Sequence, residues 1–146
     1  MMKHYIKLQS GNTIETAILE ERFSSLTFTM ENGFRKTYTD HDLYLCLAQI
    51  RRDFPEIKFL CKGAKLNVFP SRMCSQMSNG AVAYEMTLGE AASRDHIVHI
   101  FDFEDKNITN DISEQIEFYH QWISYFRPKQ TNPVKPQPQL KEDQSI

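Results

Sequence analysis

The chain has 146 residues, of which 40% are hydrophobic and 25% charged, as is typical of one soluble globular domain that buries a core without disulfides or metals. Its formal net charge of −2 excludes the basic surplus that general nucleic-acid binding requires. The absence of a long apolar run or an apolar N-terminal signal core, together with three cysteines without paired spacing, predicts a cytoplasmic protein that does not enter a membrane.

Strands are predicted for most of the first 38 residues. Polar and apolar residues alternate over 5–9, and Ser10-Gly11-Asn12 is a turn signal. Asn32-Gly33 lies between two β-prone runs, 23–30 and 34–38. Because this dipeptide can supply positive φ at both turn positions, the two runs are predicted to pair as an antiparallel hairpin.

The period then changes to that of a helix. Thr39 or Asp40 can cap a helix over about 40–53, whose apolar residues recur at helical spacing (Leu43, Cys46, Leu47 and Ile50). Short strands are predicted at 57–61 and 66–69, a short helix at 72–77 and a buried strand at 81–88. The segment 96–103 fits either a strand or a single helical turn.

The last predicted element is a helix over about 111–126. Asp111 and Glu114 have the spacing of a capping box, and Ile116, Tyr119 and Ile123 belong to a wide apolar stripe expected to pack on the sheet. The order of elements predicts an α+β fold. In it, a mostly antiparallel sheet with N-terminal hairpins is packed by the two longer helices and one short helix.

A change in composition marks the end of the predicted domain, which spans 1–127. Residues 128–146 hold four of the six prolines (Pro128, Pro133, Pro136 and Pro138) and few apolar residues. Such a segment cannot bury enough surface to offset its ordering entropy, so a disordered Pro/Gln-rich tail is predicted.

No motif predicts a catalytic residue, a metal site or a cofactor. Glycines are single and scattered, which excludes phosphate-binding loops, and no serine-nucleophile motif occurs. His96 and His99 could share a metal only if both lay on a helix, and Cys74 is the most plausible reactive thiol, so a small Cys/His enzyme remains an alternative. Tyr119 and Trp122 could form a stacking platform, although core packing is the simpler interpretation.

The charges are unevenly distributed along the chain. Residues 51–84 carry six basic and two acidic groups, whereas residues 85–117 carry two basic and nine acidic groups. If the acidic segment forms one surface, it can steer association with a basic partner; otherwise it serves only solubility.

Residues 67–103 contain Pro70-Ser71, Met73 and Met77, Gly80, Ala83-Tyr84, Gly89 and Ile100-Phe101-Asp102. This pattern resembles small bacterial immunity proteins of polymorphic-toxin and contact-dependent growth inhibition systems. The resemblance implies a protein without chemistry of its own that binds and neutralises a cognate toxin domain, for example a basic nuclease. An adaptor or chaperone-like structural protein is the alternative.

Within this hypothesis the partner-binding residues fall in the acidic segment. Glu85, Asp102, Glu104 and Asp105 are predicted to steer the partner, and Phe103 to anchor it. A core position at a strand end is the alternative for Phe103.

Overall fold

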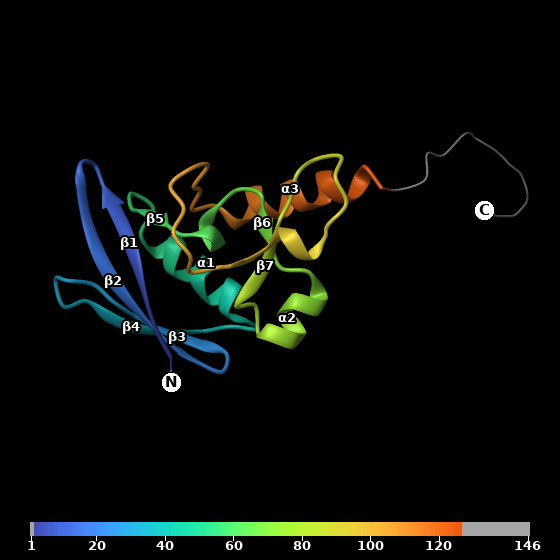
Figure 1. Cartoon of the computed structure of the whole chain (residues 1–146). Coiled ribbons are helices and arrows are strands. Elements are labelled where there is room, and N and C mark those ends of the chain that lie inside the picture. Colours follow the sequence, from blue (N-terminus) through green and yellow to red (C-terminus); the bar gives the residue numbers. More distant parts are fainter. Residues whose placement is uncertain (1, 127–146) are drawn as a thin grey trace, which may run out of the picture.

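The computed structural model describes residues 2–126, and the predicted tail at 128–146 lies outside this range. Within it, two antiparallel sheets and three α-helices confirm the predicted α+β class (Figure 1). The first sheet has the strand order β4-β3-β2-β1-β5. Its strands are β1 (Met2–Ser10), β2 (Thr13–Arg22), β3 (Ser25–Thr29), β4 (Arg35–Thr39) and β5 (Lys58–Leu60).

The second sheet is smaller and has the order β6-β7-β8. Its strands are β6 (Val68–Phe69), β7 (Val82–Glu85) and β8 (Ile97–His99). The helices are α1 (Leu43–Asp53), α2 (Arg72–Ser78) and α3 (Ile112–Ser124), and two 3₁₀ turns are η1 (Lys62–Ala64) and η2 (Arg94–His96). In Figure 1, α1 lies between the first sheet and the half of the molecule that contains α2 and α3. The segment 96–103, for which either a strand or a helical turn was expected, contains both. His96 is the last residue of η2, and β8 follows it directly.

The two predicted hairpins form with different turns. Gly11 at φ +60° lies in a two-residue turn, because Ser10 pairs directly with Thr13. Between β3 and β4 the closing pair is Thr29 with Arg35, so five residues form the loop. Gly33 has φ +95°, but Asn32 is not in the left-handed region, and the prediction of positive φ at both positions is wrong.

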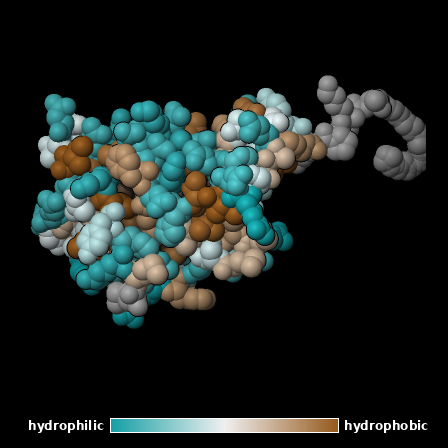
Figure 2. All heavy atoms as spheres, in the orientation of Figure 1, coloured by the Kyte–Doolittle hydropathy of each residue, from teal (hydrophilic) through white to brown (hydrophobic). Residues whose placement is uncertain are grey.

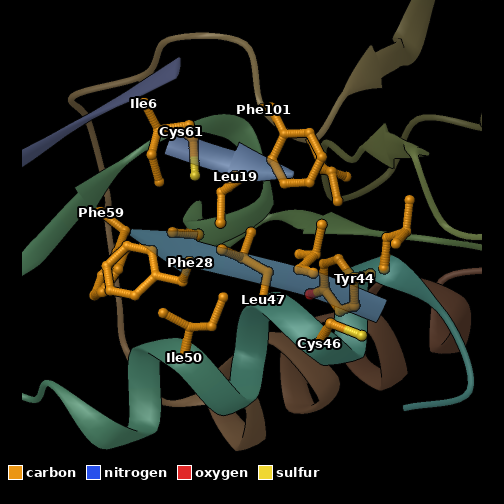
Figure 3. Packing of buried hydrophobic residues seen from close by; sticks show 14 of the residues in the cluster. Ile6, Leu19, Phe28, Tyr44, Cys46, Leu47, Ile50, Phe59, Cys61 and Phe101 are labelled. Carbon is orange, nitrogen blue, oxygen red and sulfur yellow. The ribbon is translucent and has the colours of Figure 1, made fainter. Parts of the chain in front are cut away.

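The main core lies between the first sheet and α1. Leu47 and Ile50 of α1 point toward Leu19 and Phe28 on the inner face of the sheet, and all four are fully buried (Figure 3). Each such side chain contributes about 1.5–3 kcal/mol on leaving water. The cap of α1 is Asp42, whose carboxylate accepts the Leu45 N–H at 2.9 Å, rather than Thr39 or Asp40.

Helix α3 is less covered than its apolar stripe predicted. It lies against β6 (Figure 1), yet Gln115 is its single buried residue and Ile116 is 36% exposed. The predicted capping box does not close, because Glu114 accepts a hydrogen bond from the Thr109 hydroxyl instead of the N–H of Asp111. The helix therefore packs on a sheet as predicted, but through only part of its apolar stripe, and much of its aromatic surface is accessible.

Candidate functional site

Four of the five predicted partner-binding residues are consecutive in a short loop that the structure fixes at its base. Phe103 forms an isolated antiparallel bridge with Cys61, next to the end of β5. The Lys62 N–H donates to the Asp102 carbonyl at 2.8 Å, and the Glu104 N–H donates to the Leu60 carbonyl at 3.3 Å. These bonds extend the pairing of β5 and hold the loop against the first sheet. We call residues 102–105 the docking loop.

Beneath the docking loop lies a cluster of two lysines and two glutamates. Lys62 Nζ is 3.0 Å from both Glu85 Oε1 and Glu104 Oε1, and Lys65 Nζ is 2.6 Å from Glu85 Oε2 and 2.9 Å from Glu104 Oε1. Glu104 is only 8% exposed. Each lysine thus bridges both carboxylates, so that β7, η1 and the loop are joined by charge-assisted hydrogen bonds.

The ionisation of Glu104 is strongly favoured in this cluster. Burial opposes its negative charge, but hydrogen bonds from Lys65 and Lys62 outweigh burial and lower its pKa to about 2. Its second oxygen also accepts the backbone N–H groups of Asp105 and Lys106, at 3.0 and 2.8 Å. The buried carboxylate therefore determines the backbone path of the docking loop.

This arrangement corrects the expectation for two residues. Glu85 and Glu104 are neutralised by lysines of the same molecule, so they have no free charge with which to steer a partner. Sequence alone did not reveal this, because the lysines come from the basic segment 51–84 and the fold brings the two oppositely charged segments together.

The other three predicted residues are exposed. The Phe103 side chain is 59% exposed, so the alternative of a core position is excluded, and Asp102 and Asp105 on either side are also exposed. Asp105 has a 3.7 Å contact with Lys106, but both side chains are solvated and such a pair is weak. The docking loop presents one large apolar side chain between two carboxylates.

A second surface feature was missed by the sequence analysis. A groove of about 390 Å³ opens between the second sheet, α2 and α3. It is lined by Phe69, Ser71, Arg72, Met73, Tyr84, Met86, Ala92, Tyr119 and Trp122, a set we call the aromatic groove. Figure 2 shows one face of the molecule, on which most residues are hydrophilic and the hydrophobic ones form separate patches, one of them over the second sheet.

Aromatic rings stack along the α3 side of this groove. The ring centroids of Tyr119 and Phe69 are 4.6 Å apart, with an interplanar angle of 25°. The ring centroids of Trp122 and Tyr119 are 6.3 Å apart, with an interplanar angle of 23°. The Trp122 indole N–H donates to the Glu90 carbonyl at 2.9 Å, which fixes its ring. Tyr119 and Trp122 are thus half-buried rather than core residues, and their positions are set by stacking.

The groups considered for Cys/His chemistry are not assembled into one site. The three cysteines are free and buried, and burial raises the pKa of both Cys46 and Cys61 to about 11. His99 lies beside His4 of β1, with ring centroids 5.4 Å apart, and burial together with His4 lowers the pKa of His99. Among residues 2–126, no group of three or more His, Cys, Asp or Glu side chains could hold a metal.

Comparison of the sequence with protein-family models finds no match, and comparison with characterised proteins finds no significant similarity. No helix in the described part of the chain is long and apolar enough to cross a bilayer.

Proposed function

We propose that this chain is a cytoplasmic immunity-type protein, which binds a toxin domain and neutralises it without catalysing a reaction. The observation that carries the proposal is the exposed Phe103 between two exposed carboxylates on a loop fixed from below. The resemblance of residues 67–103 to immunity proteins supports the class of partner. The free, unpaired cysteines are compatible with a reducing compartment.

The proposed binding mechanism assigns different tasks to the acidic residues. Asp102 and Asp105 attract a basic surface, such as the phosphate-binding cleft of a nuclease, and accelerate encounter. Phe103 then leaves water and supplies affinity as an apolar anchor. Glu104, held by two lysines, keeps the loop in one conformation, which reduces the entropy lost when the complex forms.

Protection from the toxin is the direct test. The chain is co-expressed with the C-terminal domain of the secreted protein encoded immediately upstream of its gene, and growth is measured. Wild-type chain restores growth, whereas the triple variant Asp102→Lys, Phe103→Ala, Asp105→Lys does not, although it folds.

A matched control removes another exposed phenylalanine and reverses two other exposed acids: Phe23→Ala, Glu56→Lys, Glu117→Lys. This control protects as well as wild type. Equal protection by both triple variants, or no toxic domain encoded upstream, contradicts the proposal.

The aromatic groove favours a second candidate function, that of an adaptor. Apolar grooves with stacked aromatic rings and a flexible methionine accommodate extended peptides. In that case substitutions in the docking loop leave partner binding unchanged, and substitution of Tyr119 abolishes it.

A further inference from the structure

We infer that the aromatic groove is the docking site for the Pro-rich segment 133–138 of the same chain. The inference is independent of the docking loop, because no residue of that loop lines the groove. It rests on the chemistry of the groove, on where α3 ends, and on the sequence that follows.

The groove has the composition that recognises polyproline helices. Its aromatic faces, among them Tyr84, Tyr119 and Trp122, offer flat apolar surfaces on which pyrrolidine rings pack. Neither tyrosine hydroxyl is hydrogen-bonded to another side chain or backbone group within residues 2–126. Both can therefore donate to the carbonyl oxygens of a bound strand, which are unpaired in a polyproline helix.

The segment Pro133-Val134-Lys135-Pro136-Gln137-Pro138 has the matching chemistry. Pro133 and Pro136 have the P-x-x-P spacing, which places both rings on one side of a helix with three residues per turn. The fixed φ of proline means that little conformational entropy is lost when the segment binds.

The chain length permits this contact. Helix α3 ends at Ser124, and Trp122 lies one turn or less before that end. Pro133 lies seven positions after Phe126 in the sequence, and seven extended residues can span up to about 23 Å. The distance back along α3 from Phe126 to Tyr119 is about 10 Å. The tail can therefore turn back onto the groove.

The intramolecular connection makes a weak contact sufficient. A short covalent connection gives an effective concentration in the millimolar range, so a segment of low intrinsic affinity still occupies the groove. Docking would also cover the apolar surface that α3 leaves exposed, including Phe126, whose ring lies 5.1 Å from Trp122.

Trp122 provides the test, because it is the chain's one tryptophan. Fluorescence and acrylamide quenching are measured on the full chain, with wild type compared to Pro133→Ala, Pro136→Ala, Pro138→Ala. The triple variant is expected to emit at longer wavelength, with a quenching constant raised by about twofold as the indole becomes accessible to solvent. A control with three tail substitutions outside the segment, Gln139→Ala, Gln144→Ala, Ser145→Ala, keeps the wild-type values.

Nuclear Overhauser contacts provide a second readout. In wild type, proline ring protons of 133–138 are expected to show contacts with the Tyr119 or Trp122 ring, at all protein concentrations. Identical quenching of wild type and the proline variant, without such contacts, overturns the inference. A difference that appears only as protein concentration rises also overturns it, because the groove would then hold the tail of a second copy.

Discussion

Arg51 of α1 donates a 3.0 Å hydrogen bond from Nη2 to the side-chain oxygen of Gln115 in α3, and both side chains are fully buried. The guanidinium also donates to the Thr109 and Gly63 carbonyls, and the Gln115 amide donates to the Gly63 and Lys65 carbonyls. Neutral carbonyl and amide oxygens thus accept the hydrogen bonds of the buried guanidinium, and the resulting network connects α1, η1 and α3. Gln115 is the one fully buried residue of α3, and the stacking of Tyr119 on Phe69 adds a second contact between this helix and the rest of the fold.

Removing one partner of this network is expected to be costly. Gln115→Ala leaves one N–H of the buried Arg51 guanidinium without a partner. It also removes one of the two hydrogen bonds that each of the Gly63 and Lys65 carbonyls accepts, so the free energy of unfolding falls by about 2–4 kcal/mol. Gln121→Ala, at an exposed position of the same helix, changes it by less than about 0.5 kcal/mol. Urea unfolding followed by circular dichroism measures both values, and an equal effect of the two substitutions would contradict this assignment.

Gly80 is required for two reasons at once. Its φ is +78°, and an added Cβ would lie 2.7 Å from Cγ of Asp42, the N-cap of α1. Gly80→Ala therefore strains the backbone and displaces the cap, and lowers the unfolding free energy by more than about 2 kcal/mol.

Gly11→Ala is the matched comparison for Gly80, because φ there is +60° and no atom lies within 4 Å of the added Cβ. It introduces backbone strain alone, which costs about 1–2 kcal/mol. Thermal unfolding of both variants measures the difference, and similar melting temperatures would show that contact with Asp42 does not matter.

The lysine–glutamate cluster predicts a loss of stability in acid. The pKa of Glu104 is about 2 in the folded chain against an ordinary value of 4.5, so its contribution is complete above pH 4.5 and disappears as the pH falls towards 2. In Glu104→Gln this part of the pH dependence is absent, and the decrease in unfolding free energy over this range is shallower than in wild type.

Glu117→Gln serves as the control for the acid effect, since Glu117 is exposed and has no ion-pair partner among residues 2–126. When urea unfolding is measured at several pH values, the unfolding free energy of Glu117→Gln is expected to decrease with falling pH as steeply as that of the wild type. The same slope in Glu104→Gln would mean that the cluster does not favour the ionised form.

The thiols are expected to react slowly in the folded protein. Cys46 and Cys61 are buried with pKa values raised to about 11, and Cys74 is also buried. Because the thiolate is the reactive form, labelling with a disulfide reagent should require unfolding for all three. Rapid stoichiometric labelling of Cys74 in the native chain would instead favour the enzyme alternative.

Local sequence signals predicted most of the fold. The alternation in the first strands, the helical spacing of Leu43, Leu47 and Ile50, and the short helix predicted at 72–77 correspond to observed elements. The α+β fold class can be predicted from such signals because each one depends only on residues that are close together in the sequence.

The candidate site was less predictable because it depends on contacts between distant residues. The ion pairs of Glu85 and Glu104 join residues 20 to 42 positions apart. The extent to which α3 is buried could not be predicted from the sequence either. An apolar stripe indicates which face of a helix is suited to burial, but not how much surface the rest of the fold provides to cover it. The exposure of the Phe103 side chain became evident only in the folded structure, where Phe103 pairs with Cys61 just after the end of β5.

The association rate constant with the toxin domain, measured by stopped flow at increasing salt, tests the docking loop most directly. For wild type the rate constant should fall steeply with ionic strength, and Asp102→Lys, Asp105→Lys should reduce it by about tenfold or more at low salt while flattening the salt dependence. Rate constants that are equal in wild type and this variant across the salt series would contradict the account.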